Sequence, residues 1–394
     1  MNNELAPGVK WVGCVDWNVR DFHGYHTGRG STYNAYLILD EKAAAVDSVK
    51  APFSDELLEN LRRELNGRRL DYLICNHAEP DHSGSLGAVL QEHPEAELVC
   101  NAKCKATLEK HYMTSKWKFR IVKDGDCLPL GRRTATFMDT PMVHWPESMF
   151  TYLPEDRLLF SMDAFGQHLA TSGRFDDETP LATIMDEAKT YFANILMLYA
   201  RPITNTLARA ATLPVSIVAP SHGVIWRRHF PAIFKAYQDW VAFKPARKVV
   251  ILYDTMWGST DRMARAIAEG ASADGVDVKT ISIRSSHITT LAAEVLDAAA
   301  VAVGSPTLNM NMMPEIASAL TYLKGLKPLN KAGFAFGSYG WGFKGGAQVV
   351  EEQLKAMDVE ILCAPLMAQY APDAAVLAAC REAGGLLAER ALRG

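Results

Sequence analysis

The sequence predicts two successive domains: an α+β domain of stacked sheets with outer helices, then an α/β domain with a doubly wound, parallel, five-stranded sheet. Three observations support this prediction. At 394 residues the chain is too long for one ordinary core. Strands and helices change their pattern of alternation partway along the chain. A helical, aromatic stretch ends at a proline within residues 243–248, so we place the domains at 1–246 and 247–394.

The first domain opens with short β-like runs at 9–15 and 33–39, which are typical of an antiparallel meander. Later strands alternate with helices. The second domain alternates regularly, with strands expected at 248–254, 277–283, 298–304, 332–337 and 359–365 and helices at 260–272, 346–357 and 373–391. This alternation is the pattern of a doubly wound parallel sheet.

Composition narrows the class of protein. A net charge of −4 and a pI near 6.3 give no basic surface for nucleic acid or an anionic membrane. No apolar run approaches the roughly 18 residues of a spanning helix. The first residues lack the basic and apolar regions of a signal peptide. We therefore expect a cytoplasmic protein that binds neither membrane nor nucleic acid.

The cysteines argue against both disulfides and thiolate metal sites. There are seven, an odd number, and they are scattered along the chain with no C-x-x-C pair. An iron–sulfur or rubredoxin-type site within this chain is therefore not expected. Any metal chemistry must use histidine and carboxylate ligands.

A dense group of such ligands follows the predicted strand at residues 70–75. Four metal-capable side chains lie within six residues there, and three more follow other predicted strands. The full set is His77, Glu79, Asp81, His82, His144, Asp163 and His222. Because strand ends in one sheet share an edge, residues distant in sequence can converge there. Seven donors exceed the needs of one tetrahedral zinc but suit two metals that share one carboxylate, with iron, manganese or zinc as candidates.

Any one of these histidines could instead be a hydrogen-bonded core residue. The tight cluster at 77–82 argues against all four of them being core residues. Two other residues are candidates for lining the metal pocket. His23 and Tyr25 lie in a polar and aromatic loop, and either could contact the metal ligands without binding the metal itself.

The second domain begins with a strand, a hydroxyl-rich loop and a helix. The loop comprises Thr255, Met256, Trp257, Gly258, Ser259 and Thr260 and contains no lysine or arginine. The backbone N–H groups at the helix start can hold a phosphate without a cationic side chain. The loop has neither the lysine of a P-loop nor the glycines of a dinucleotide-binding turn.

Two further loops fall at the ends of the third and fourth strands, where such sheets bind ligands. The candidate binding residues in them are Pro306, Thr307, Leu308 and Asn309, and then Ser338, Tyr339, Gly340, Trp341 and Gly342. The aromatic side chains of Trp257, Tyr339 and Trp341 are candidates for packing against the ring system of a flavin.

These motifs carry a family resemblance. The pattern H-x-E-x-D-H, followed by single His, Asp and His residues, resembles the metallo-β-lactamase fold, an αββα sandwich. Glu79 stands where the hydrolases of that fold usually have histidine, and this variant resembles the flavodiiron proteins. The local contexts 77–84, 144–146, 163–166 and 221–223 agree with that family. The loop at 255–260 resembles the phosphate loop of flavodoxins, whose ligand is FMN.

The resemblance covers essentially the whole chain and implies an oxidoreductase. One iron would take His77, Glu79 and His144, the other Asp81, His82 and His222, with Asp163 bridging them. FMN would feed electrons to this di-iron site, which would reduce O₂ to water, NO to N₂O, or both. Rubredoxin or a comparable donor would supply the electrons. The resemblance also implies a head-to-tail homodimer or a dimer of dimers, in the minimal class without an appended rubredoxin domain.

Two other readings remain open. One is a zinc hydrolase of the lactamase fold with an accessory flavodoxin domain, which Glu79 disfavours. The other is a flavin electron carrier or sensor with a structural metal site. The sequence leaves open the preference for O₂ or NO, the donor, and dimer against tetramer. It departs from the family at Phe343-Lys344, a short insertion, and at Met310.

Overall fold

The structure is a computed structural model that describes residues 3–342 and 345–393. Its backbone contacts divide it into two compact units. The first unit comprises Met1–Phe192 and Tyr199–Gln238, and the second comprises Ala193–Leu198 and Asp239–Gly394. The insertion predicted at Phe343-Lys344 lies outside the described residues.

The first unit contains a seven-stranded sheet whose first half is antiparallel and whose second half is parallel. Its spatial order is β1 (Glu4–Ala6), β2 (Val9–Trp11), β7 (Tyr36–Leu39), β8 (Ala43–Val46), β9 (Tyr72–Ile74), β10 (Glu97–Asn101) and β11 (Phe119–Val122). The strands from β1 to β8 pair antiparallel, which confirms the meander, and those from β8 to β11 pair parallel. Two small hairpin-like sheets stand apart, β3 (Cys14–Asp16) with β6 (Ser31–Tyr33) and β4 (Asp21–Phe22) with β5 (Tyr25–His26).

A five-stranded sheet packs against the first one. Its order is β12 (Cys127–Pro129), β13 (Thr134–Asp139), β14 (Met149–Leu153), β15 (Leu158–Met162) and β16 (Ile217–Pro220). Tyr36 and Ile38 of the first sheet and Phe137 and Phe160 of the second belong to one buried core cluster. That cluster is the interior between the sheets, because alternate side chains of a strand point to the same face.

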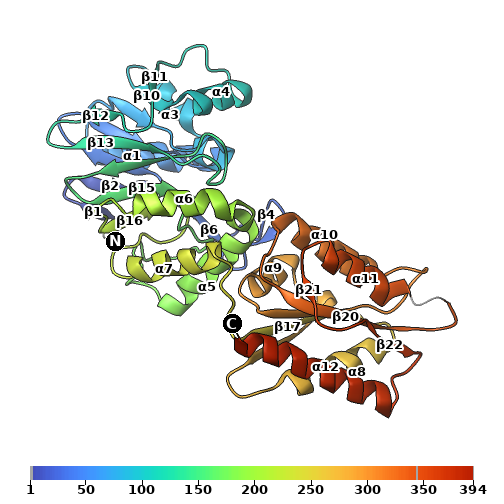
Figure 1. Cartoon of the computed structure of the whole chain (residues 1–394). Coiled ribbons are helices and arrows are strands. Elements are labelled where there is room, and N and C mark those ends of the chain that lie inside the picture. The colour runs from blue at the N-terminus through green and yellow to red at the C-terminus, as the bar shows by residue number, and fades with distance from the viewer. Residues whose placement is uncertain (1–2, 343–344, 394) are drawn as a thin grey trace. The chain divides into compact units, whose positions relative to one another are not determined.

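Helices cover the outer faces of this sandwich (Figure 1). On the first sheet lie α1 (Ser54–Leu65), α3 (Leu86–Glu92) and α4 (Ala102–His111), which bury leucines in a second core cluster. On the other side lie α5 (Leu181–Tyr191), α6 (Ala200–Ala210) and α7 (Phe230–Val241). The short α2 (Pro80–Ser83) follows β9. The layer order is therefore αββα, as predicted.

The second unit is a doubly wound parallel sheet. Its order is β18 (Asp277–Ser282), β17 (Lys248–Tyr253), β19 (Ala300–Gly304), β20 (Ala332–Tyr339) and then β21 (Glu360–Ile361), with β22 (Leu366–Gln369) also pairing with β20. All of these pairs are parallel. The strand predicted at 359–365 is present only as the short β21, and β22 follows beyond the predicted range.

Helices lie on both faces of this sheet. Figure 1 shows α8 (Ser259–Ala271) and α12 (Ala374–Arg393) together on one face and α9 (Ile288–Leu296), α10 (Pro314–Leu326) and α11 (Gly345–Lys355) on the other. Met263 and Ile267 of α8 pack with Leu387 of α12 against Val249 and Phe336 of the sheet. The strand order reverses at β17, so the crevice for a ligand is expected at the carboxyl ends of β17 and β19. Among the helices of the described ranges, none is long and apolar enough to cross a bilayer.

Candidate metal centre and flavin loops

The loop after β9 and the short helix α2 present the first four metal-capable side chains. Glu79 precedes α2 with an extended backbone (ψ 140°), and Pro80 takes the first helical position, where its missing N–H costs no hydrogen bond. The single turn that follows places Asp81 and His82 side by side, and both are buried. The local sequence therefore turns a strand end into a compact set of ligands.

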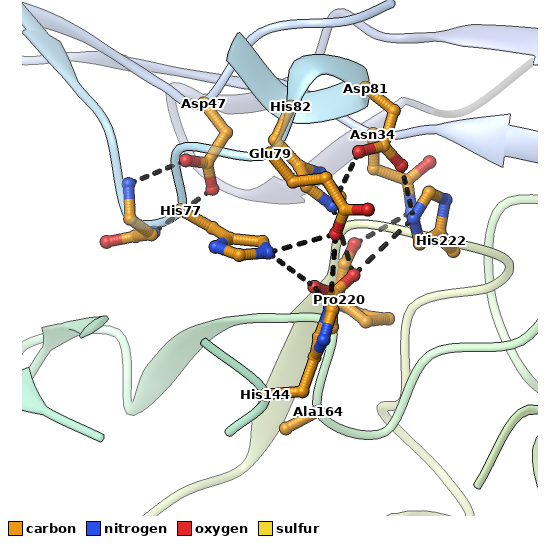
Figure 2. A network of polar contacts seen from close by, with 12 residues as sticks. Asn34, Asp47, His77, Glu79, Asp81, His82, His144, Ala164, Pro220 and His222 are labelled. Carbon is orange, nitrogen blue, oxygen red and sulfur yellow. Dashed lines mark hydrogen bonds and ion pairs between the residues drawn. The ribbon is translucent and has the colours of Figure 1, made fainter. Parts of the chain in front are cut away.

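The seven predicted metal ligands converge on one place in two groups. Figure 2 labels all of them except Asp163. In each group the ligand atoms all lie within 4.8 Å of one another, which makes each group a candidate to hold one metal ion. The groups are His77, Glu79, His144 and Asp163, and then Asp81, His82 and His222.

Asp163 belongs to both groups through its two oxygens. Its Oδ2 lies 3.3 Å from Nε2 of both His77 and His144. Its Oδ1 lies 3.1 Å from Nε2 of His82 and 3.5 Å from Nε2 of His222. A carboxylate in this position suits two metal ions that share it.

Each group is completed by a carboxylate of its own. Oε2 of Glu79 is 3.2 Å from Nε2 of His77 and 3.1 Å from Nε2 of His144. Oδ2 of Asp81 lies 3.1 Å from Nε2 of His222. The arrangement matches, residue for residue, the two groups that the family resemblance implied.

The centre has a strong negative field. Burial opposes charge on His77, but hydrogen bonds with Glu147 and Glu79 raise its pKa to about 10. Burial also opposes charge on His82, while Asp81 and Asp163 raise its pKa to about 9. Burial works against ionisation of Asp163, yet the surrounding histidines hold the pKa of its carboxyl well below the usual range. These shifts show that cationic charge is favoured where the ligand atoms meet.

The donor set fits metal ions, because several of its buried atoms have no hydrogen-bond partner. These atoms are Oδ1 of Asp81, both ring nitrogens of His82 and Oδ2 of Asp163. Buried polar atoms are otherwise almost always satisfied, so a group of them facing one another calls for a ligand. Nitrogen and oxygen donors with three carboxylates suit iron or manganese as well as zinc.

Two buried carboxylates outside the predicted set support the ligands. Oε1 of Glu147 lies 2.8 Å from Nδ1 of His77 and accepts a hydrogen bond from the N–H of Ala78. Asp47 accepts hydrogen bonds from the backbone N–H of Asn76 at 2.7 Å and from its side-chain amide at 3.2 Å. Figure 2 shows Asp47 beside the strand end that carries His77. Such partners orient metal-binding histidines.

Two more residues near the centre were not predicted. The Tyr191 hydroxyl donates a hydrogen bond to Oδ1 of Asp163 at 2.8 Å. His168, which is not among the predicted site residues, is buried with its ring centroid 5.2 Å from that of His222. His168 lies five residues after Asp163, which was the one available signal, whereas nothing in the sequence around Tyr191 indicated its place.

The two candidates from the early loop come from the β4–β5 hairpin and its turn. Nε2 of His23 is 3.4 Å from Oε1 of Glu79, although the His23 side chain is 63% exposed. Tyr25 is partly buried, and burial together with the charge of Glu79 raises its pKa. Both residues therefore lie on the Glu79 side of the centre.

In the second unit, the hydroxyl-rich loop joins β17 to α8 as predicted. Gly258 precedes the helix with φ 82°, and its N–H donates to Oγ1 of Thr255 at 3.1 Å. A Cβ at Gly258 would meet nothing within 4 Å, so the space beside the helix start is open. The neighbouring cation Arg284 is already paired with the buried Asp254 through two contacts of 2.6 and 3.0 Å. The loop therefore offers neutral N–H and hydroxyl donors, which fit a phosphate group.

The other two predicted loops lie next to this helix start. Ser338 Oγ is 3.3 Å from Thr260 Oγ1, and the N–H of Thr307 donates to the carbonyl of Ser338. The side chains of Trp257 and Trp341 are 95% and 92% exposed. Tyr370, which was not among the predicted residues, follows β22. Its ring lies beside Gly340, so close that a Cβ atom placed there would be 3.2 Å from it. The structure thus brings the three predicted loops together at one sheet edge and adds an aromatic residue.

Known proteins resemble the chain over both units. A family model described as ODP family beta lactamase matches residues 32–223, and the flavodoxin model matches residues 251–384. A protein named nitric oxide reductase from Moorella thermoacetica is 46% identical over 98% of each chain. Rubredoxin-oxygen oxidoreductase from Megalodesulfovibrio gigas is 39% identical, covering 94% of this chain and 93% of its own.

The solved structures agree. The crystal structure of the flavodiiron protein from Giardia intestinalis superposes with a TM-score of 0.96 at 38% identity, covering 100% of this chain and 97% of that one. With an αββα unit that gathers two groups of metal ligands, a flavodoxin-like unit and full-length similarity of this kind, the chain belongs to the flavodiiron protein family.

Proposed function

We propose that this protein reduces O₂ to water, NO to N₂O, or both, at a di-iron centre that receives electrons from FMN. The observation that carries the proposal is the pair of ligand groups joined by Asp163, with a carboxylate, Glu79, in the first group. A hard anionic ligand in that position favours iron. The names of the Moorella and Megalodesulfovibrio relatives supply the two substrates.

His77, Glu79 and His144 would hold one iron, Asp81, His82 and His222 the other, and Asp163 both. FMN would bind through the loops already described, with its phosphate at the start of α8. When bound, the irons supply open coordination positions for a diatomic gas, and FMN accepts electrons in pairs and releases them singly.

The chain's own residues prepare this site in three ways. Glu147 fixes the ring of His77 through its Nδ1, so that Nε2 faces the centre. The side chains of His77, Asp163, His82 and His222 are at most 2% exposed, which excludes bulk water. Glu79 and His144 are 14% and 12% exposed, so the open side of the centre, through which a gas would enter, lies beside them.

The electron donor is a rubredoxin or a protein of similar potential. The support is the name of the Megalodesulfovibrio relative, a rubredoxin-oxygen oxidoreductase. We place the enzyme in the cytoplasm, a compartment that suits its seven free cysteines. We also propose that the di-iron domain ends at residue 246 and that the FMN domain begins at residue 247.

We further propose a head-to-tail homodimer, alone or paired into a tetramer. A domain of about 246 residues has a radius of gyration of about 18 Å, so a flavin and a metal centre in one chain can be tens of Å apart. A partner chain would bring its flavin to these metals. Interface variants that are folded monomers and keep full turnover would refute this assembly.

The decisive test counts iron and FMN per chain, reduces the protein without oxygen, and follows its reoxidation by O₂ and by NO in a stopped-flow instrument. We expect two irons and one FMN, and fast reoxidation by at least one gas. Two zincs without iron would favour a hydrolase instead. His82→Asn should abolish gas reduction; if it leaves reductase- and rubredoxin-driven O₂ consumption unchanged, the protein is an electron carrier with a structural metal site.

A further inference from the structure

Gas reduction at this centre consumes protons as well as electrons, and polar side chains lie next to the shared carboxylate Asp163. Reduction of O₂ to water and of NO to N₂O and water both take up one proton for each electron. His77, Asp81, His82, Asp163 and His222 are buried, whereas Glu79 and His144 lie on the open side of the centre. A polar route through the first unit would bring protons to Asp163 without using that open side.

The inner end of such a route is Tyr191. Its hydroxyl donates to Oδ1 of Asp163 at 2.8 Å, and its side chain is buried at the end of α5. Its ring centroid lies 4.9 Å from that of His168, whose Nδ1 is 3.0 Å from Oγ of the buried Ser31. Nε2 of His168 is buried and has no hydrogen-bond partner. Hydroxyl and imidazole groups thus gather directly behind the bridging carboxylate.

The outer end is Glu187, which lies one helical turn before Tyr191 on the same face of α5. Residues four apart on a helix lie on the same face, with Cβ atoms about 6 Å apart. Proton transfer between the Glu187 carboxyl and the Tyr191 hydroxyl would use a bridging water molecule. Arg29 holds the carboxylate through an Nε–Oε1 contact of 2.9 Å, and the Arg29 side chain is 55% exposed. The carbonyl of Arg29 accepts a hydrogen bond from the N–H of Ala170, two residues after His168. Glu187 therefore lies between solvent and the inner polar groups.

We propose that Glu187 is the residue that takes up protons from solvent and passes them inward toward Tyr191 and Asp163 during gas reduction. This inference rests on the proposed function and adds a proton-supply residue to it. In each transfer the Glu187 carboxyl loses its O–H proton to the inner polar groups, and the carboxylate, held by Arg29, regains a proton from bulk water. Glu187 touches neither substrate nor metal ligands, so it acts through Tyr191.

The surroundings of Glu187 suit this exchange. Burial raises the pKa of Glu187 to about 6, the charge of Arg29 lowers it, and the neighbouring Asp186 raises it. A group with this pKa can both gain and lose a proton near neutral pH. Because the protonated form is the donor, the proton-transfer rate should fall as pH rises above about 6.

The test compares Glu187→Gln, which cannot carry a proton, with Glu187→Asp and with Glu59→Gln, the same change at an exposed position of α1. Pre-reduced holoenzyme, checked for iron and FMN content, is mixed with O₂ and with NO between pH 5 and 9. We expect Glu187→Gln to slow reoxidation about tenfold or more and to lose the decline above pH 6. Glu187→Asp should recover part of the rate, and Glu59→Gln should match the wild type. A wild-type rate and pH profile in Glu187→Gln would overturn the proposal.

Two further measurements guard against a merely structural effect. Arg29→Gln keeps the Glu187 carboxyl but removes the cation that lowers its pKa. The pH above which the reoxidation rate declines should therefore rise in this variant, and an unchanged pH profile of reoxidation would contradict the inference. Infrared difference spectra should show a protonated carboxyl that titrates near pH 6 in the wild type and is missing in Glu187→Gln, and absence of that signal in the wild type would also overturn it. If the wild type reacts with neither gas, the proposed function itself fails, and the infrared titration still decides whether Glu187 exchanges protons.

Discussion

Single side chains that bind no metal decide how the metal ligands are presented. Glu147 and Asp47 are both buried and act on opposite sides of His77: the first fixes its ring and the second the backbone just before it. Ser48 adds a third support, because its N–H and hydroxyl both donate to the carbonyl of His82. The ligand loop is therefore held at both of its ends.

Glu147→Gln should weaken iron binding without unfolding the protein. The variant keeps an oxygen for Nδ1 of His77 but loses the negative charge that makes the imidazole a better donor. Loss of such a partner typically costs about 10- to 100-fold in metal affinity. Iron affinity measured by competition with a chelator tests this, with Glu155→Gln, a change on the surface of the same unit, as the control. Equal affinities for Glu147→Gln and the wild type would contradict the supporting role.

Asp47→Ala should destabilise the first unit by about 1–3 kcal/mol, because it leaves the buried N–H of Asn76 without an acceptor. Asp47 also has φ 58°, a left-handed backbone that Asn tolerates better than Ala. Asp47→Asn should therefore recover part of the loss. Urea titrations followed by circular dichroism measure both variants, and an unchanged unfolding midpoint in Asp47→Ala would refute the argument.

Among the elements, β17 and α9 of the second unit are joined by a charged cluster. Nζ of Lys248, at the start of β17, contacts Glu294 of α9 and lies 3.1 Å from Oδ1 of Asp297. Nζ of Lys279 on β18 is 2.7 Å from Oε1 of Glu294. Burial opposes ionisation of Glu294, but hydrogen bonds from both lysines lower its pKa below the ordinary value.

This cluster gives a pH dependence with a definite sign. A carboxyl whose folded-state pKa is lowered stabilises the fold above its ordinary pKa of about 4.5, and that stability is lost as pH falls through the folded value. Glu294→Gln should thus cost about 2 kcal/mol at pH 7, less than a fully buried pair because Asp297 remains, and the cost should shrink below about pH 4.5. The stability cost of Glu294→Gln is measured from the urea-induced release of FMN at pH 7 and pH 4, with Glu382→Gln at an exposed position as control. A cost that grows as the pH falls would show the sign to be wrong.

Elements whose sequence pattern was strong were predicted closely, and those interrupted by a special residue were not. The helix expected at 260–272 is α8, Ser259–Ala271. The strand expected at 359–365 is only the short β21, and Pro365, which lacks a backbone N–H, separates it from β22 just beyond the expected range. The run at 9–15 splits at Gly13, where a Cβ would come within 2.2 Å of the carbonyl oxygen of Tyr33. The need for glycine at this position follows from the backbone at Tyr33 passing close by, which the sequence around Gly13 does not indicate.

For the molecule as a whole, the two units have separate cores and should respond separately to their cofactors. Removing iron with a chelator should lower the unfolding temperature of the first unit, because the metal binds only the folded state and its loss leaves Asp163 and its neighbours without a cation. FMN content and the transition of the second unit should stay unchanged. Differential scanning calorimetry of the holoenzyme and the chelated protein measures this, and a shift of both transitions together would contradict independent units.

The sequence by itself determined the order of the two folds, the seven candidate ligands and the hydroxyl-rich loop before α8. Those features are local, because hydrophobic periodicity and short motifs at strand ends can be read in one stretch of chain. The family resemblance had already implied which ligands share Asp163, whereas tertiary structure alone decided that Asp47, Glu147, Tyr191 and His168 surround them. Those contacts join residues distant in sequence, and only the packing of two sheets and their helices brings the partners together.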